Sequence, residues 1–456
     1  MTKLQNERGS ILLAAFAILA LLVIIMTALI AYGSWHKARC QLVLNRVRAT
    51  YLAEAGIQHA LAEIRRSGGN RTDTQSVHLD ATSSFTFSAH PWGGYLKIES
   101  KGISGRTEER LQATIGQVAP KIFTNTLSLI GPPYPLVVAG NTRIDGDVQV
   151  GPAGVSRGEL HGQSYVGDSL VNGSIGTLQQ QQVPQLITDL IDQFLDDLKV
   201  AERDCRNRTD LSLIIKKGAE ASSQDTESRK TSALIVFDVS DTTPVRRPQC
   251  LFADGSITVT GQSHLQHQVL MSASSITVKQ DAYLSDCILV APCITLTDHV
   301  DVSGQLFADS LVVVEGEAKL SEMALVYLVG HPVNDEWTGM INIESNRTSE
   351  ACLVFHGNMH TDANVSQQIK QTGRVRIAPT GTVNGIIWTE GYLEMLGTMN
   401  GSAAANLLYY YESPTLYLNW LVNASIGPER DNGKRVLPLI FGQRPVYEFK
   451  KIGPGA

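Results

Sequence analysis

A short apolar pattern repeats at a nearly fixed spacing across residues 251–329, and this repeat constrains the fold more than any other feature of the sequence. Consecutive units begin 18, 19, 18 and 18 residues apart, at Leu251, Val269, Ile288, Leu306 and Ala324. A single coil cannot bury its own apolar face, whereas coils of constant length stack and bury the faces of their neighbours. The repeat therefore predicts a parallel β-helix rather than an irregular β-sandwich.

Each unit carries two further apolar positions, which predicts three short strands per coil with polar or glycine corners between them. The second position falls at Ile257, Ile276, Ile294 and Val312, and the third at Leu265, Leu284, Val302 and Leu320. Strands of one sheet lie about 4.8 Å apart. We therefore expect Ile276 and Ile294 to point inward from adjacent coils and to touch.

Similar segments flank the repeat. Residues 135–151 alternate apolar and polar residues and have glycine corners, as initial coils would. Toward the C-terminus, GTVNG at 381–385 recurs as GTMNG at 397–401, which predicts further, shorter coils. This part is similar to bactofilins, whose β-helices repeat a G-x-V-x-G rhythm. Residues 332–349 are expected to connect two β-helix blocks.

One helical segment interrupts the predicted coils. After Pro184, apolar side chains share one helical face, namely Leu186, Leu190, Ile191, Phe194, Leu195 and Leu198. This spacing is typical of an amphipathic helix that lies against a larger core. The polar segment 216–231 is expected to be a mobile loop.

The N-terminal region contains an uninterrupted apolar stretch from Ser10 to Tyr32. A helix of this length can cross a hydrocarbon core of about 30 Å. A secretory signal would have a shorter apolar core followed by a small-residue cleavage site. Here the small residue, Gly9, comes before the apolar stretch, so processing would leave the helix on the mature protein. A plain single-span anchor is the alternative interpretation.

This arrangement resembles the leader of type IV pilins and type II secretion pseudopilins, in which a prepilin peptidase cuts after a glycine. The resemblance implies cleavage after Gly9 and a new N-terminus at Ser10. Residues 51–56 (YLAEAG) resemble the AEAG element of PilX-type minor pilins. Residues 94–102 and 110–115 resemble the strand pair that follows in that family, so the likeness covers about residues 1–118.

The resemblance also implies a role for the long helix. Major pilins carry Glu at the fifth mature position, whereas this chain has Ala14 there, as tip-type minor members do. Subunit packing would use the apolar side chains of the lower half of the helix, and the candidates are Leu42, Val47, Leu52, Ala55 and Leu61.

Composition limits the partners and cofactors. Charged residues make up 18% of the chain, the net charge is −6, and there is no basic block, so we expect no nucleic-acid partner. The six cysteines lack CxxC or Cys/His ligand spacing, which predicts no metal site. One or two disulfides and buried thiols both remain open.

Many parallel β-helices act on acidic polysaccharides, so catalytic residues were sought on adjacent coils. The nearest candidates are Asp281, Asp286, Asp298, His299 and Asp301, with His264 and His267 one coil earlier. His267 and Asp286 are one period apart and could stack. Between residues 251 and 323 the sequence has no Arg and only two Lys, Lys279 and Lys319, so a site for an acidic sugar would lack its usual cations. We therefore expect no enzyme activity, no catalytic residues and no cofactor.

These observations predict a mainly β protein: a long N-terminal α-helix with a small pilin-like β unit, then a parallel β-helix with a helical insertion. The expected segments are a leader (1–9), a long transmembrane helix (10–66), a small β unit (67–118), first coils (119–180), a helical insertion and loop (181–231), central coils (232–331), and C-terminal coils with a cap (332–456).

The expected function is that of an exported, membrane-tethered minor pilin-like subunit of the bacterial inner membrane, which presents its periplasmic or surface-exposed β-helix for adhesion or pilus assembly. The expected partners are the inner membrane, prepilin peptidase and other pilin-like subunits, with a surface polysaccharide as a further candidate. A bactofilin-like membrane-anchored polymerising scaffold is the main alternative, and a surface carbohydrate-active enzyme is a weaker one.

Overall fold

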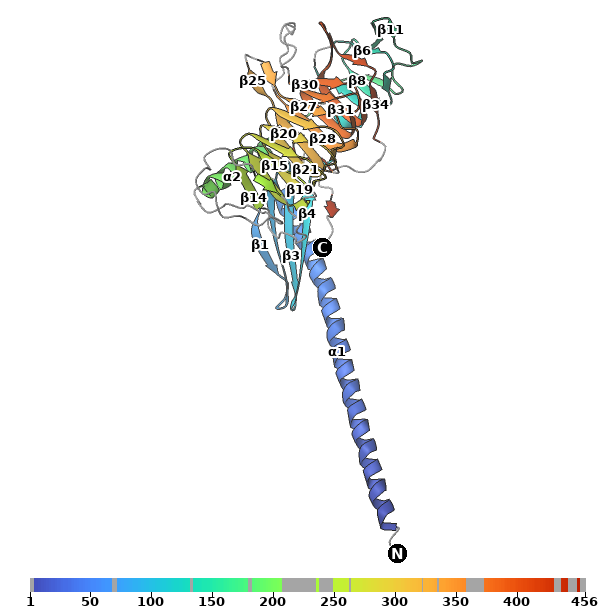
Figure 1. The fold of residues 1–456 in the computed structure, drawn as a ribbon, viewed down its shortest axis with the longest axis vertical. Helices are drawn as coiled ribbons and strands as arrows, with labels where there is room; N and C mark the ends of the chain where they lie inside the picture. Colours follow the sequence, from blue (N-terminus) through green and yellow to red (C-terminus); the bar gives the residue numbers. More distant parts are fainter. Residues whose placement is uncertain are drawn as a thin grey trace, which may run out of the picture. The chain divides into compact units, whose positions relative to one another are not determined.

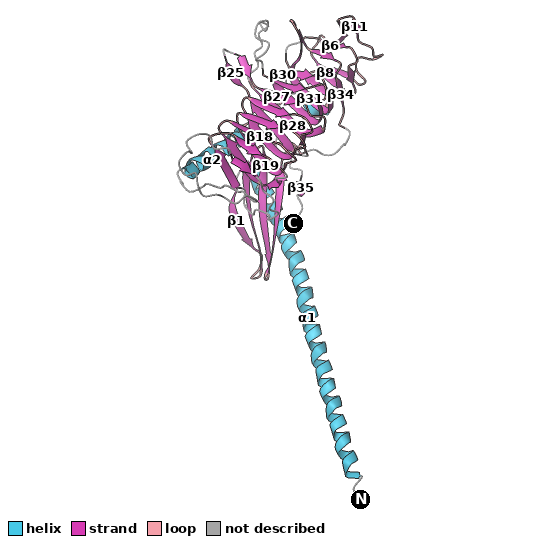
Figure 2. Cartoon of the chain, in the orientation of Figure 1, coloured by secondary structure: helices cyan, strands magenta, loops and turns pink. Residues whose placement is uncertain are grey.

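A computed structural model of the chain consists of one long helix followed mainly by short strands (Figure 1). Figure 2 shows how strongly strands dominate, so the predicted mainly β fold class is confirmed. The described residues are 4–67, 72–131, 134–178, 183–206, 235–237, 249–261, 264–321, 323–333, 336–357, 373–429, 436–441 and 449–451. The loop predicted over residues 216–231 lies outside them.

The chain divides into two compact units. The first contains residues 1–90, 97–114 and 450–455, and the second contains residues 91–96, 115–449 and 456. Each unit is described by itself below.

Helix α1 (Leu4–Ser67) is the main element of the first unit. Its sequence is rich in Ala and Leu and contains no proline, which favours a continuous helix. It ends just before the Gly68-Gly69 pair. In its C-terminal third, one face is buried, formed by Ala49, Ala53, Ile57, Ala60, Leu61 and Ile64. That spacing is the one an amphipathic helix needs to cover a sheet.

The sheet of the first unit has strands in the order β1 (Thr72–His78), β2 (Ser83–Trp92), β3 (Tyr95–Ser104), β4 (Thr107–Ile115) and β35 (Phe449–Lys451). The two segments that resemble the minor-pilin strand pair are thus β3 and β4, and they are neighbours in this sheet.

Glycines allow α1 to approach this sheet closely. A Cβ at Gly102 would lie 2.0 Å from the carbonyl oxygen of Ala49, and a Cβ at Gly56 would lie 2.1 Å from Ser100 Oγ. Gly102 cannot hold a larger side chain without a shift of the helix or the sheet, because the added carbon would meet the backbone of α1. Gly56 of the AEAG element is explained by close packing of α1 against the side chains of Ser100 and Phe85.

The second unit is built mainly of stacked parallel strands. Its central coils use β14 (Gln249–Ala253), β15 (Ile257–Val259), β16 (His264–Gln266), β17 (Gln268–Ser272), β18 (Ser275–Val278), β19 (Tyr283–Val290), β20 (Cys293–Leu296), β21 (Asp301–Ala308), β22 (Leu311–Val314), β23 (Lys319–Leu320) and β24 (Ala324–Val329). Corresponding strands of successive coils pair in parallel, which is the predicted solenoid.

The second and third apolar positions of the repeat are confirmed residue by residue. Ile257 pairs with Ile276, which pairs with Ile294. Leu265, Leu284, Val302 and Leu320 form an equivalent row. Ile276 and Ile294 are both fully buried, as expected.

The register predicted for the first position is wrong by one residue at two of its four steps, and by two residues at the last, where Leu306 pairs with Val326 rather than with Ala324. Leu251 pairs with Leu270 and Leu289 with Leu306, so Leu251 does not pair with Val269, nor Ile288 with Leu306. A register shift between Ser285 and Cys287 changes the coil length locally. A bulge of this kind adds a residue to one strand and reverses which side chains face the core.

The sheet that begins with β14 is apolar on both faces. Leu270, Leu289 and Leu306 belong to the interior of the solenoid. Their neighbours form a second core outside it, which includes Val269, Ile288, Phe307, Leu325, Tyr327, Val354 and Trp388. Strands covered on both sides have near-continuous apolar sequences, which is why the inward row could not be chosen from hydrophobicity alone.

The predicted amphipathic helix contributes to that outer core. It is α2 (Asp189–Arg206), and its residues Ile191, Phe194 and Leu198 pack among the outward side chains. The same cluster also contains Trp92, Tyr95, Ile122, Phe123, Val436, Leu437, Ile440 and Phe441. The helical insertion is therefore confirmed as a helix lying against the solenoid.

The coils continue through residues 332–349, which were expected to be a connection. Strands β25 (His331–Val333) and β26 (Glu336–Thr338) form a short hairpin. Strand β27 (Met340–Ile343) then pairs directly with β22, so the β-helix is not interrupted there. That expectation was wrong because the hairpin, rather than the whole segment, is the insertion.

The GTVNG and GTMNG segments stack as predicted. They begin β30 (Thr382–Met395) and β31 (Thr398–Glu412), which follow β28 (Thr348–His356) and β29 (Arg374–Ile377). Asn400 donates a hydrogen bond to Asn384 of the preceding coil, at 2.8 Å. Gly385 and Gly401 have positive φ and lie in contact, and a Cβ at Gly401 would lie 2.0 Å from the Gly385 oxygen.

Coils that come first in the sequence come last in the stack. Strand β5 (Leu127–Leu129) pairs with β31, β8 (Val148–Val150) pairs with β5, and β12 (Ile175–Thr177) pairs with β8. Beside them, β7 (Arg143–Ile144) pairs with β34 (Ser425–Gly427), and β6 (Leu136–Ala139) lies between β33 (Trp420–Val422) and β9 (Val155–Arg157).

The remaining strands are local. The hairpin of β10 (Glu159–Leu160) and β11 (Gln163–Ser164) follows β9. Strand β32 (Thr415–Leu418) folds back on β31 as an antiparallel hairpin. Strand β13 (Ile235–Phe237) pairs with β15 at the other end of the stack.

Candidate functional site

The N-terminal half of α1 exposes an apolar surface within its unit. The helix is long and apolar enough to cross a membrane, and none of its most apolar 18-residue window is buried. The large apolar side chains between Leu12 and Tyr32 that are exposed have between 46% and 74% of their surface exposed. Such a continuous apolar surface on a soluble protein normally marks a membrane or protein contact.

Aromatic and cationic side chains follow the apolar stretch on the same helix. The ring of Tyr32 lies 6.3 Å from that of Trp35 and 6.2 Å from that of His36. The Arg39 guanidinium lies 5.5 Å from the centre of the Trp35 ring. This combination is typical of a helix at a membrane–water interface.

The structure places the predicted processing and packing residues as follows. Gly9 and Ser10 lie in the first turns of α1. Leu42, Val47 and Ala55 are exposed, and Leu52 is half-buried. Leu61 is buried in the core of its own unit, where it lies on the same helical face as Ile57 and Ile64.

Three of the acidic candidates, Asp281, Asp286 and Asp298, lie at the corners of the coils, and the fourth, Asp301, begins strand β21. Asp281, Asp286, Asp298 and His267 all have φ between +52° and +59°. Asp, Asn and His tolerate this left-handed conformation better than other non-glycine residues. Turn geometry therefore accounts for these residue types without any chemistry.

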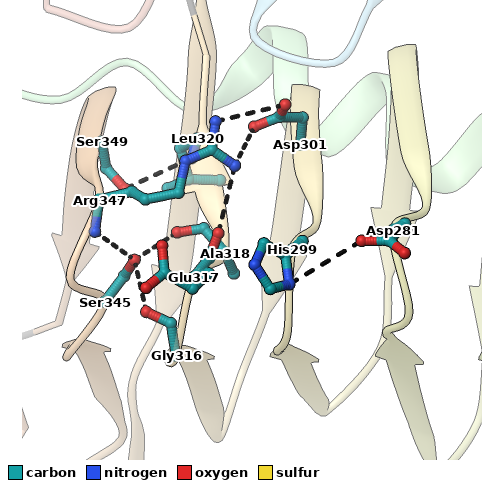
Figure 3. A network of polar contacts seen from close by, with 10 residues as sticks. All are labelled: Asp281, His299, Asp301, Gly316, Glu317, Ala318, Leu320, Ser345, Arg347 and Ser349. Carbon is teal, nitrogen blue, oxygen red and sulfur yellow. Dashed lines mark hydrogen bonds and ion pairs between the residues drawn. The ribbon is translucent and has the colours of Figure 1, made fainter.

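Figure 3 shows a polar network among these corners. Arg347, from a later coil, lies with Nη1 3.0 Å from Asp301 Oδ1, and the same nitrogen donates to the Glu317 carbonyl at 3.2 Å. Ser345 donates to the Ala318 carbonyl at 2.5 Å. His299 Nδ1 is 3.9 Å from Asp281 Oδ1. The network holds successive corners together.

The predicted stacking of His267 and Asp286 is confirmed. His267 Nδ1 lies 2.5 Å from Asp286 Oδ2, and Trp92 Nε1 donates to Asp286 Oδ1 at 2.8 Å. Next to it, the buried Gln305 accepts a hydrogen bond from Gly94 N at 2.7 Å and donates one to Trp92 O at 2.8 Å. Both contacts attach residues 92–94 to the coils, which is a structural role.

A second polar cluster, which sequence reasoning missed, lies on the last coils. Arg374 and Arg376 of β29 both approach Glu394 of β30, with Nε to Oε2 distances of 3.0 and 3.5 Å. Arg376 also donates to Asn342 Oδ1 at 3.1 Å, and Asn342 donates to Glu344 at 3.1 Å.

Two tyrosines complete this cluster. The Tyr392 and Tyr409 rings lie 5.7 Å apart in an edge-to-face arrangement, and the Arg374 guanidinium is 5.4 Å from the centre of the Tyr409 ring. Burial raises the pKa of Tyr409, which keeps its hydroxyl protonated. The available signal was the alternation Arg374-Val375-Arg376, followed 18 residues later by Tyr392-Leu393-Glu394.

Within the described residues, no group of three or more His, Cys, Asp or Glu side chains could hold a metal ion.

Comparisons with known proteins add little. No family model and no curated protein matches the sequence. Among solved structures, the chain is similar to the competence-associated pilin ComZ from Thermus thermophilus, with 13% identity, 90% of this chain and 97% of that chain covered, and a TM-score of 0.20. At that TM-score the likeness carries no argument, and the proposals below rest on the chain's own residues.

Proposed function

We propose that the chain is an exported, membrane-tethered, minor pilin-like subunit that presents its β-helix for adhesion or for pilus assembly. The observation that carries this proposal is α1 (Figure 2). One continuous helix has an exposed apolar N-terminal half and a C-terminal third that packs on a small sheet. The apolar half would lie in the inner membrane first and then pack against other pilin-like subunits.

Residues before and within the helix fit this route. A prepilin peptidase would cut after Gly9 and leave Ser10 as the N-terminus of the mature chain. Ala14 takes the place of the Glu that a main fibre subunit would carry, which favours a minor, tip-type position. The second unit would then project from the cytoplasmic membrane into the periplasm or onto the cell surface.

We propose a structural rather than a catalytic role for the β-helix. Support comes from the corner acids, because their conformations and ion pairs give each of them a place in the fold.

One observation favours the alternative of an end-to-end polymer. Among the described strands, β12 pairs only with β8, and all three of its residues are exposed. An exposed edge strand can pair with another chain, although an edge this short is a weak template. Polymerisation as a scaffold would use the edge strand β12 as its contact surface, whereas pilus assembly would use α1.

Processing at Gly9 tests the main proposal. We expect Gly9→Val to leave residues 1–9 on the membrane form, because a bulky residue cannot fill the position before the cut. Gly33→Ala is a matched control in the same helix, since a Cβ at Gly33 would meet nothing within 4 Å. Intact-mass measurement of the purified proteins provides the readout. A wild-type membrane form that still begins at Met1 would contradict the pilin-like leader and favour a plain single-span membrane anchor.

A further inference from the structure

The outward side chains of one solenoid face change character along the stack. On the first coils this row consists of Thr258, Thr277 and Thr295, which pair in register. The row continues through Val313 to Asn342, Arg376 and Glu394. Small hydroxyl residues suffice for a solvated strand, so the change to large planar polar groups needs another explanation.

The neighbouring row changes in the same way. Ser275 and Cys293 are followed by Leu311, Met340, Arg374 and Tyr392. The two rows together place two guanidinium groups, one carboxylate, one amide and one phenol ring on adjacent coils. Glu344, just after β27, adds a second carboxylate, and Tyr409 of β31 adds a second phenol ring. Strands hold all of them except Glu344, and this is the pre-organisation that a binding face requires.

The charges of this cluster balance one another. Arg374 and Glu394 have side chains only 18% and 11% exposed and form an ion pair, while Arg376 is 26% exposed and bridges Glu394 to Glu344. A polyanion would have to compete with both carboxylates for the arginines. A polycation would be repelled by the two arginines, which already pair with the carboxylates. The face therefore suits a ligand that is polar but carries no charge.

We propose that the cluster of Asn342, Glu344, Arg374, Arg376, Tyr392, Glu394 and Tyr409 is a binding face for a neutral saccharide. Planar guanidinium and carboxylate groups present pairs of donors or acceptors that match vicinal hydroxyls. The half-buried Tyr392 ring offers an apolar surface for the C–H face of a pyranose, and its hydroxyl offers a hydrogen bond.

This inference deepens the adhesive role proposed above, and it rests on that role only for delivery of the β-helix to the cell surface. Binding is measured on the purified chain, whereas processing at Gly9 is measured by mass. A negative result for saccharide binding therefore leaves the result on processing interpretable, and a negative result for processing leaves the binding result interpretable.

The test uses the full chain in detergent, with affinity electrophoresis through gels that contain dextran, amylose, hydroxyethylcellulose, galactomannan, polygalacturonate or alginate. We expect retardation by at least one neutral polymer, and we expect Tyr392→Ala and Arg376→Gln each to weaken it by about tenfold or more, a loss of one bidentate or stacking contact. Arg374 and Glu394 are left intact because breaking their buried pair would endanger the fold.

Thr277→Ala is the matched control, because Thr277 lies on the same face but on an earlier coil. Its retardation should equal that of the wild type, and circular dichroism should show all variants folded. Three results would overturn the proposal: no retardation by any neutral polymer, retardation by the acidic polymers alone, or neutral retardation that folded Tyr392→Ala and Arg376→Gln variants retain in full.

Discussion

At the scale of single residues, conformation explains positions that composition alone left ambiguous. The sequence placed Asp281, Asp286 and Asp298 at corners, where carboxylates serve either solubility or chemistry. Their left-handed backbone accounts for the residue type at these positions, because Asp adopts this conformation more readily than most other side chains. Contacts such as Arg347 to Asp301 could not be predicted, since they join residues 46 positions apart across an inserted hairpin.

Close packing at Gly102 gives a prediction for the first unit. Gly102→Ala should destabilise this unit by about 1–3 kcal/mol, the usual cost of overpacking, because the added carbon would meet the backbone oxygen of Ala49. Gly33→Ala should have no such cost, because its surroundings are open. Chemical denaturation followed by proteolysis of the α1 region would compare the two. Equal stability of both variants would show that helix and sheet are farther apart than described.

The His356–Glu390 pair predicts a pH dependence of stability. Its 2.8 Å hydrogen bond raises the pKa of His356 above 6.5, against the opposing effect of burial, and Asp192 adds to the rise. A folded-state pKa above the unfolded one gives stabilisation that is complete below about pH 6.5 and is lost as the pH rises through the folded pKa.

Thermal unfolding between about pH 5 and 9 would test this dependence. Glu390→Gln keeps an acceptor for the Gly357 N–H, which now donates to Glu390 at 3.0 Å, but removes the charge. As the pH rises across this range, we expect the melting temperature of the wild type to fall by more than that of the variant. Parallel curves would rule out a contribution from the pair.

At the scale of elements, the repeat predicted the strands but not all of their registers. Rows with one buried face, such as Ile257 to Val312, were assigned correctly from hydrophobic spacing. The row covered on both faces was misassigned by one or two residues, because adjacent residues such as Val269 and Leu270 are both buried. The position of the register shift before Cys287 could not be predicted from the repeat. Unit lengths of 18 and 19 residues show that coils differ by one residue, but they do not show where in the coil the extra residue lies.

Ile276 and Thr277 test the assigned register on adjacent residues of β18. Ile276→Asp would bury an unpaired charge between coils and should unfold the local stack. Thr277→Asp faces outward and should cost no more than about 0.5 kcal/mol. Secretion level and thermal unfolding of both variants provide the comparison. A folded, fully stable Ile276→Asp protein would mean that Ile276 does not point into the core.

At the scale of the whole chain, the order of coils in space was not predictable. Strand β5 pairs with β31, where Leu127 lies beside Ala403, and β8 stacks on β5 in turn. Parallel pairing between segments so distant in the sequence leaves no periodic trace in it. Each unit nevertheless matches its sequence-level description: a long helix on a small sheet, and stacked parallel strands with one helix on their outer face. The Arg374 cluster was not predicted, because the last coils were recognised from their glycine motifs, and these motifs do not include the charged and aromatic residues of β29 and β30.

If α1 provides the assembly surface, a cross-linker on its exposed side should reach neighbouring subunits. In-cell photo-cross-linking from Val47, which is 47% exposed on α1, tests this, with Val166, which is 73% exposed in the second unit, as the control. We predict that a benzophenone side chain at 47 yields adducts with pilin-like subunits, identified by mass spectrometry, and that one at 166 does not. Adducts from 166 to a second copy of this chain, with none from 47, would contradict the account and favour an end-to-end scaffold.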